Sequence, residues 1–179
     1  GPMTSLTNKC ILVVGASSGI GCAAAEYMAQ QGAKIVGVGR NLDATLSVIN
    51  TLPGEGHQAV EADVTDEKQL DEIIKIGKKT GGFDGGVFCA GLHEVRPFSL
   101  LKADNLLNSY NANVISAINC TKALSKAANR NGAGIVWLSS VAAMRGTAGF
   151  AAYAAAKGAL ISAAKVAAVE LAKKKIRVN

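Results

Sequence analysis

Tyr153 and Lys157 are the two residues whose types and spacing best suit acid–base chemistry. They lie four residues apart in an alanine-rich segment, and on a helix this spacing puts both side chains on one face. A free phenol has a pKa of about 10, and a neighbouring ammonium lowers that pKa because it favours the phenolate. Such a phenol can give a proton to a carbonyl oxygen and recover it later. The same spacing is also common in ordinary contacts on helix surfaces, so the pair alone leaves both interpretations open.

Ser140 is the next candidate for chemistry. It ends a short apolar run and precedes Tyr153 by thirteen residues. In open parallel sheets ligands bind at the carboxyl ends of strands, which is where this hydroxyl is expected. Ser139 is an alternative, and serine is frequent at strand ends and in turns without any catalytic role.

A glycine-rich loop follows the first apolar run of the chain. Its sequence is Gly15-Ala16-Ser17-Ser18-Gly19-Ile20-Gly21, and a helical pattern begins at once. Gly15 permits a tight turn, Gly19 permits close approach of a pyrophosphate, and Gly21 permits close packing of helix on strand. The free amides and positive dipole end of that helix then face the phosphates. The alternative is an ordinary turn between a strand and a helix; its place after the first strand favours a phosphate loop.

The elements that must position these residues alternate between strand and helix. Apolar runs predict strands at 9–14, 33–38, 58–62, 85–89, 134–139 and 176–178. Helical patterns lie between them at 19–31, 43–51, 66–78, 103–129 and 151–173, with Thr65 as a possible cap and a possible break near Asn111. This alternation predicts the α/β class, with a doubly wound parallel sheet covered by helices on both faces.

Together these motifs resemble the short-chain dehydrogenase/reductase family, whose nucleotide loop has the spacing Gly-x-x-x-Gly-x-Gly found here. The resemblance runs from Lys9 to Asn179 and implies a Rossmann-type fold. In the family a serine holds the substrate carbonyl, a tyrosine delivers the proton, a lysine tunes that tyrosine and binds the nicotinamide ribose, and an asparagine interrupts its helix and holds a water near the lysine. The implied catalytic residues are Ser140, Tyr153, Lys157 and Asn113; Asn111 lies two residues too early.

The resemblance also implies a set of cofactor-binding residues. Asp63 matches the aspartate that hydrogen-bonds the adenine amino group, although aspartate is also common in turns and helix caps. The full set is Gly15, Ser17, Ser18, Gly19, Ile20, Gly21, Arg40, Asp63, Val64, Ala90, Gly91, Tyr153 and Lys157. The chain departs from the family pattern at Val14, where threonine is usual, and at Phe88-Cys89, where two asparagines are usual. The second departure affects local stability more than chemistry.

The end of the second predicted strand favours NADP(H) over NAD(H). An acidic side chain there would bind an unphosphorylated ribose and repel a 2′-phosphate, but Gly39 occupies the place. Arg40 follows, and its planar guanidinium suits a phosphate. Alternatively, Arg40 is a surface residue paired with Asp43.

Composition limits the other classes of function. The net charge of +6 comes from scattered basic residues, apart from 173–175, so nucleic acid is not an expected partner. We expect no membrane span, because no apolar run approaches about 20 residues, and no secretion signal. The four cysteines show no ligand spacing, which predicts buried free thiols in a reducing compartment, neither disulfides nor a metal site, and a cytoplasmic protein.

The sequence therefore predicts one domain over 3–179 that transfers hydride from NADPH to a ketone or 3-oxoacyl group. Residues 1–2 resemble a protease scar, and the family usually continues beyond the sixth strand, so we expect a C-terminally incomplete domain. One alternative is oxidation of a secondary alcohol such as a sugar or steroid. Another is a nucleotide-binding sensor without turnover. The expected partners are a small or carrier-bound carbonyl substrate and further copies of the chain, as a homodimer or homotetramer.

Overall fold

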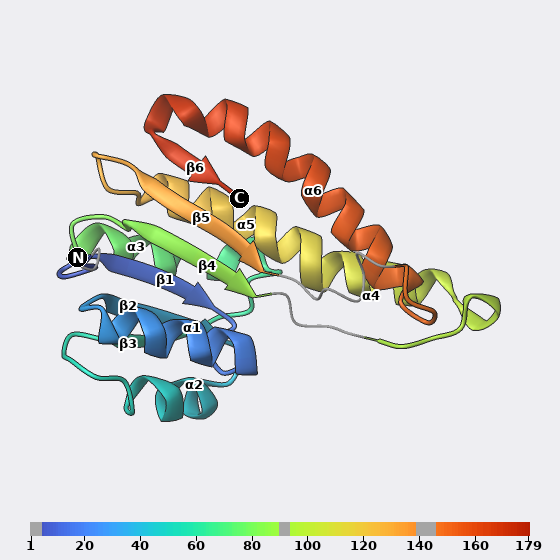
Figure 1. Cartoon of the computed structure of the whole chain (residues 1–179), viewed down its shortest axis with the longest axis horizontal. Helices are drawn as coiled ribbons and strands as arrows, with labels where there is room; N and C mark the ends of the chain where they lie inside the picture. Colours follow the sequence, from blue (N-terminus) through green and yellow to red (C-terminus); the bar gives the residue numbers. More distant parts are fainter. Residues whose placement is uncertain (1–4, 90–93, 139–145) are drawn as a thin grey trace.

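Six parallel strands form one sheet in the computed structural model, which describes residues 5–89, 94–138 and 146–179 (Figure 1). The strand order is β3-β2-β1-β4-β5-β6. The strands are β1 (Cys10–Val14), β2 (Lys34–Gly39), β3 (Gln58–Glu61), β4 (Gly85–Cys89), β5 (Ala133–Leu138) and β6 (Ile176–Val178). Each end lies within one residue of the predicted boundary, and all five pairings are parallel, so the predicted fold class is confirmed.

The direction of the chain through the sheet reverses beside β1. From β1 the chain moves outward through β2 and β3, then returns to the opposite side of β1 as β4. At the carboxyl end of β1, Val14 pairs with Val38 on one side and Phe88 on the other. This reversal is the point where doubly wound sheets bind ligands.

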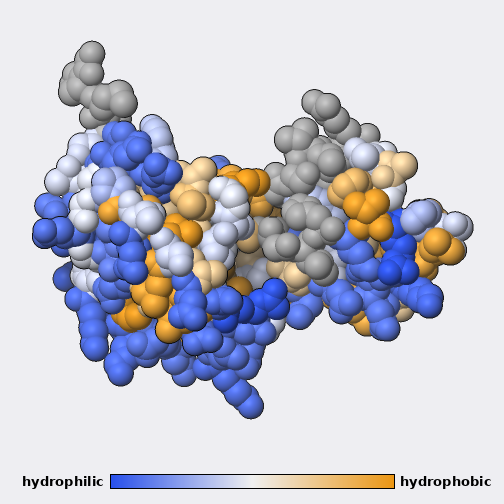
Figure 2. All heavy atoms as spheres, turned by 90° about the horizontal axis from the view of Figure 1, so that it is seen from below, coloured by the Kyte–Doolittle hydropathy of each residue, from blue (hydrophilic) through white to orange (hydrophobic). Residues whose placement is uncertain are grey.

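Helices cover both faces of the sheet. α1 (Gly19–Gln30) and α2 (Leu42–Ile49) lie on one face, while α3 (Asp71–Lys79), α5 (Ser116–Lys126) and α6 (Ala151–Leu171) lie on the other (Figure 1). The molecule seen from below presents mainly hydrophilic side chains, with hydrophobic ones in scattered groups (Figure 2).

Side-chain alternation along β1 explains why its sequence is apolar at every position. Ile11 and Val13 pack into the cluster beneath α1 and α2, whereas Leu12 and Val14 pack into the larger cluster beneath α3, α5 and α6. A strand of a parallel sheet is buried on both faces, so every side chain is apolar.

The predicted long helix 103–129 is interrupted where the sequence suggested a break. It consists of α4 (Ala103–Tyr110), a π-helical segment η3 (Asn111–Ile115) and α5, which ends at Lys126. π-helical turns widen the backbone spiral and are frequent at functional sites. The break places Asn113 at the inner side of the widened turn, where it is 1% exposed.

The region after β3 differs from the predicted helix 66–78. A short 3-10 turn, η1 (Glu67–Gln69), comes first, and α3 begins only at Asp71. Thr65 is not the cap, because its hydroxyl and amide both donate to Asp63. Asp66 caps η1 instead, accepting from the Lys68 amide. A second short turn, η2 (Phe98–Leu100), was not predicted.

α6 is more apolar than the sequence analysis allowed. Together with the 3-10 turn η5 (Ala172–Lys174) it is long and apolar enough to cross a membrane, with a mean hydropathy of 1.3. The statement that no apolar run approaches this length was therefore too strong. A mostly buried core helix of a soluble protein passes the same test, whereas only 22% of this window is buried; α6 packs against α4 and β6. This one helix is weak evidence for a membrane.

The four cysteines are free thiols, as predicted, but only two of them are buried. Cys10 and Cys120 lie in the core, whereas Cys22 and Cys89 are partly exposed. The described residues contain no group of three or more side chains that could hold a metal ion.

Candidate active site

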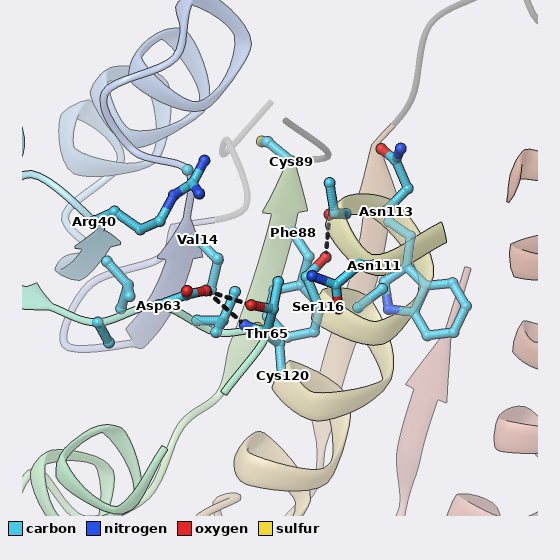
Figure 3. Close-up of a pocket in the computed structure, with 18 of the residues that line it drawn as sticks. Val14, Arg40, Asp63, Thr65, Phe88, Cys89, Asn111, Asn113, Ser116 and Cys120 are labelled. Carbon is cyan, nitrogen blue, oxygen red and sulfur yellow. Dashed lines mark hydrogen bonds between the residues drawn. The ribbon is translucent and has the colours of Figure 1, made fainter. Parts of the chain in front are cut away.

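A cavity of about 410 Å³ lies at the carboxyl ends of β1, β2, β4 and β5. Figure 3 shows Arg40 and Asp63 on one side of it and Asn113 and Ser116 on the other. The cavity therefore extends from the predicted cofactor residues to the π-helical segment η3. Its position at the reversal of strand order is that of a ligand site in a doubly wound sheet.

The glycine-rich loop has the geometry that its sequence predicts. A Cβ added at Gly21 would lie 2.0 Å from the carbonyl oxygen of Gly15, so the helix can approach the strand only because residue 21 is glycine. A Cβ added at Gly19 would meet nothing within 4 Å. The side of the loop at Gly19 is thus open to an approaching ligand.

Ser18 shapes the start of α1. Its hydroxyl donates to the Gly15 carbonyl at 2.7 Å and accepts from the Gly21 amide at 3.0 Å. The amides of Gly19 and Ile20 have no hydrogen-bond partner among the described residues. α1 has no acidic residue in its first turn, so its positive end offers these two donors to an anion.

Cys89 closes the other side of the loop. A Cβ at Gly15 would lie 3.1 Å from the Cys89 carbonyl oxygen, and Gly15 itself has a φ of 82° that favours glycine. Burial raises the pKa of the Cys89 thiol to about 11, against a smaller opposing effect of its hydrogen bond with Ser18. The thiol is therefore neutral near pH 7 and brings no negative charge to the phosphate loop.

The end of β2 has no room for an acidic side chain. A Cβ added at Gly39 would lie 2.5 Å from the Thr45 hydroxyl, which is fully buried and donates to the Asn41 carbonyl at 2.9 Å. Arg40 lines the cavity and forms no ion pair with Asp43 among the described residues. The alternative interpretation of Arg40, as a partner of Asp43, thus finds no support.

Asp63 and Val64 line the same side of the cavity as Arg40 (Figure 3). Thr65 donates to Asp63 Oδ1 through its hydroxyl at 2.6 Å and its amide at 3.0 Å, as the dashed lines in Figure 3 show. The hydroxyl bond is the main reason why the pKa of the Asp63 carboxyl is lowered, and the charge of Arg40 adds to it. Asp63 is therefore a carboxylate that can accept further hydrogen bonds.

The π-helical segment brings Asn113 to the cavity. Its side-chain nitrogen Nδ2 donates to the Ser109 carbonyl at 2.8 Å and lies 3.2 Å from the Ser109 hydroxyl. The segment packs on α6, where Val114 and Ala117 contact Ala156 and Leu160. Asn113 is thus held against the helix that carries the tyrosine and the lysine.

Tyr153 and Lys157 share α6 but do not line the cavity. Tyr153 is 2% exposed and Lys157 is half-buried. Burial lowers the pKa of the Lys157 ammonium. Ser140, Ala90 and Gly91 lie outside the described residues, as does the alternative Ser139, so the expected contact of Ser140 with Tyr153 stays a prediction.

The cavity floor contains residues that the sequence analysis did not place in the site. Phe88 and Trp137 are register partners on β4 and β5, and Cys120 lies beside them on α5. The indole nitrogen of Trp137 donates to the Thr121 hydroxyl at 3.1 Å. Strand alternation puts Trp137 on the same face as Ile135, which is the signal that could have found it.

Comparison with known proteins gives the same architecture and a family. Residues 9–179 match the family model described as short chain dehydrogenase. The chain is 32% identical over 173 residues to carbonyl reductase family member 4 of Danio rerio, and 33% identical over 174 residues to the 3-oxoacyl-[acyl-carrier-protein] reductase of Bos taurus. Each match covers 96% of this chain and 73% of the relative.

A solved structure agrees with these sequence matches. The hydroxysteroid dehydrogenase of Escherichia coli superposes with a TM-score of 0.85 at 28% identity, over 98% of this chain and 74% of that one. The chain belongs to the short-chain dehydrogenase family. It is an oxidoreductase of that family, and the relatives it resembles include carbonyl and 3-oxoacyl reductases.

Proposed function

We propose that the protein uses NADPH to reduce a ketone or 3-oxoacyl group. The observation that carries the proposal is the cavity at the reversal of strand order, which runs from Arg40 and Asp63 to Asn113 beside α6. One end suits an adenosine phosphate, and the other end meets the helix of Tyr153 and Lys157. The names of the similar carbonyl and 3-oxoacyl reductases support the substrate class.

The end of β2 supports a preference for NADP(H) over NAD(H). Position 39 has no space for the carboxylate that would bind an unphosphorylated ribose, since the Thr45 hydroxyl is in the way. Arg40 provides a permanent positive charge on the cavity wall, and Asp63 is the only carboxylate among the lining residues described. A guanidinium suits a phosphate because its donors form a planar fork.

The residues of the chain have separate roles in the proposed reaction. The nicotinamide of the bound cofactor supplies the hydride. Tyr153 delivers a proton to the carbonyl oxygen as negative charge develops there, and Ser140 donates a hydrogen bond to the same oxygen. Lys157, on the same helix as Tyr153, binds the nicotinamide ribose. Asn113 holds a water that returns protons from solvent.

The phosphate loop has a binding role only. The amides of Gly19 and Ile20, unpaired among the described residues, receive the pyrophosphate at the positive end of α1 together with the Ser17 hydroxyl, while Ser18 shapes the loop through its bonds to Gly15 and Gly21. Ala90 and Gly91 follow β4 in the sequence, and we assign them to the cofactor site on the family resemblance alone.

The test is turnover by the complete protein with NADPH and a panel of ketones and 3-oxoacyl thioesters. We expect NADPH consumption by the wild type, and a loss of at least about a hundredfold in kcat for Tyr153→Phe, since general acid catalysis contributes about 10²–10⁴-fold. NADPH affinity should stay within about twofold, because the aromatic ring is retained and only the hydroxyl is lost. Unchanged kcat in Tyr153→Phe would refute the assigned role, and the absence of turnover with intact NADPH binding would favour the sensor alternative.

Oxidation of a secondary alcohol is the second candidate reaction. The structural similarity to a hydroxysteroid dehydrogenase favours it, and the same residues would act in reverse. Assays of sugar and steroid alcohols with NADP⁺ and NAD⁺ distinguish the two directions. A higher kcat/KM for an alcohol than for any ketone would make this candidate the better one.

We also propose that the protein is a cytoplasmic homodimer or homotetramer without nucleic-acid or membrane partners. Large apolar side chains are exposed on α6 and α4, with Val166 58%, Val169 75% and Leu107 64% exposed. A second copy that covered them would remove this apolar area from water. Light scattering of the complete protein tests the assembly, and a monomer at high concentration would contradict it.

A further inference from the structure

Asn119 is a buried polar residue that none of the family motifs includes. It lies on α5, is 3% exposed, and donates through its side-chain nitrogen Nδ2 to the Val64 carbonyl at 2.9 Å. This bond joins positions 55 residues apart in the sequence. Burying an amide is costly unless it is hydrogen-bonded, so the side chain and the Val64 carbonyl depend on each other.

We propose that Asn119 is a positioning residue for adenine, acting through the loop 63–65. The inference rests on the proposed function, because it assumes that an adenine nucleotide occupies the cavity. Asn119 itself would touch neither the cofactor nor the reacting atoms.

The loop 63–65 is shaped by its own hydrogen bonds but is not fixed in place by them. Thr65 donates twice to Asp63 Oδ1, which folds the loop on itself. Outside the loop, the Asp63 amide donates to Gln69 Oε1 at 2.7 Å. Gln69 is an exposed residue of η1, which follows the loop directly in the chain, so this bond is a local one.

Asn119 attaches the loop to a different part of the molecule. α5 packs against β4 in the centre of the sheet, and its residues Cys120, Ala123 and Leu124 belong to the main hydrophobic core. The Asn119 side chain is therefore a fixed point relative to the sheet. By holding the Val64 carbonyl, Asn119 sets the orientation of the peptide group between Val64 and Thr65.

Two atoms of the loop are left available to a ligand by this arrangement. The Val64 amide has no hydrogen-bond partner among the described residues, and the Thr65 bonds use only Oδ1 of Asp63. One donor and one acceptor side by side match the edge of adenine, which offers an amino group and a ring nitrogen. Both Asp63 and Val64 line the cavity.

The experiment compares ligands with and without adenine. In Asn119→Leu we expect the Kd of NADPH and of 2′,5′-ADP to rise about tenfold, the effect of losing about one hydrogen bond. The kcat at saturating NADPH and the kcat/KM of reduced nicotinamide mononucleotide, which lacks adenine, should stay within about twofold. Asn119→Ala is the second variant, because it removes the donor without placing apolar bulk against the Val64 carbonyl.

Thr121→Val is the matched control. Thr121 is also buried on α5 and also hydrogen-bonded, but its hydroxyl meets Ala117 and Trp137 rather than the loop. It should lower Tm without a selective change in adenine affinity. Equal losses for NADPH and for the mononucleotide, or unchanged 2′,5′-ADP affinity in both Asn119 variants, would overturn the inference. If the wild type bound neither NADPH nor 2′,5′-ADP, the proposed function itself would fail, a result distinct from the other two.

Discussion

The two halves of the cavity are positioned by different physical means. On the nucleotide side, backbone segments approach so closely that only glycine fits, with a hypothetical Cβ 2.0 Å from a carbonyl at Gly21 and 2.5 Å from a hydroxyl at Gly39. On the reaction side, Asn113 lines the cavity and Tyr153 lies on the adjacent helix α6, and helix packing buries both to 1% and 2% exposure. The first half is fixed by steric exclusion, and the second by the contacts between η3 and α6.

This difference predicts where each half is vulnerable. On the nucleotide side, one methyl group added at such a glycine would clash, because backbone atoms at the loop cannot move apart without disturbing the strand. A packed helix face tolerates small changes of shape, but its chemistry depends on one functional group at a time. Substitutions on the two sides should therefore separate cofactor binding from turnover.

The largest effect is expected for Gly21→Ala. The added Cβ would collide with the Gly15 carbonyl and with the Ser18 hydroxyl, which lies 2.9 Å from it. We expect α1 to be displaced from β1, with a loss of about 3 kcal/mol in the free energy of unfolding and of detectable NADPH binding. Urea unfolding and fluorescence titration with NADPH measure the two effects.

Gly19→Ala is the control for that variant. Its Cβ would meet no protein atom within 4 Å, so the free energy of unfolding should stay within about 0.5 kcal/mol. NADPH should nevertheless bind more weakly, because the methyl group occupies the side of the loop assigned to the pyrophosphate. Destabilisation of Gly19→Ala comparable to that of Gly21→Ala would contradict the close approach at Gly21 as the cause, because helix propensity favours alanine over glycine.

The second effect in size is expected for Arg40→Asp. Removing the guanidinium weakens NADPH binding, and the new carboxylate repels the 2′-phosphate. We expect the ratio of kcat/KM for NADPH to that for NADH to fall about a hundredfold. Arg40→Gln, which removes the charge without adding a repulsive one, should cause a smaller fall. A ratio that is unaltered in both variants would remove Arg40 from the phosphate site.

The sequence predicts most of the nucleotide half because its constraints are local. The spacing of Gly15, Gly19 and Gly21 and the absence of an acidic residue at Gly39 can be read without knowledge of the fold. The central strands β1 and β4 are predicted equally well, since a strand buried on both faces is apolar at every position. The break at Asn111 was also visible, because asparagine disfavours helix interiors.

The remaining features depend on contacts between distant segments. Nothing near Asn119 in the sequence indicates that its partner is Val64, 55 residues earlier. The sequence suggested Thr65 as the cap of the helix after β3. In the folded loop the Thr65 hydroxyl donates to the Asp63 carboxylate instead, and this contact is not visible in the sequence. The apolar character of α6 was underestimated because isolated lysines interrupt its apolar runs while the average hydropathy stays high.

The third prediction concerns the thiol at the boundary of the two halves. Burial raises the pKa of Cys89 from 9.0 to about 11, so its thiolate should be about a hundredfold scarcer at pH 8 than that of a free thiol. A more basic thiolate is more nucleophilic, which reduces the net slowing of alkylation to about tenfold. Alkylation by iodoacetamide, with Cys89→Ser as the background, should accelerate up to about pH 11 rather than level off near pH 9.

The raised pKa of Cys89 also makes the stability of the fold depend on pH. Because the folded-state pKa is raised, the neutral thiol contributes stability that is fully present below pH 9 and is lost as the pH rises through about 11. A plateau of the alkylation rate near pH 9 would mean that Cys89 is solvated in the native protein.

The smallest effect is expected for Lys122→Ala. Lys122 and Asn119 both project from α5 toward the segment after β3, but Lys122 forms an exposed ion pair with Glu67, with an N–O distance of 3.3 Å and side chains 52% and 71% exposed. Exposed pairs contribute about 0–1 kcal/mol because water and salt screen them. We expect the free energy of unfolding and the Kd of 2′,5′-ADP to change by less than about 0.5 kcal/mol and about twofold, respectively. If Lys122→Ala weakened the binding of 2′,5′-ADP as much as Asn119→Leu does, the surface ion pair rather than the buried hydrogen bond would hold the segment. The affinity for the adenine nucleotide would then depend on ionic strength.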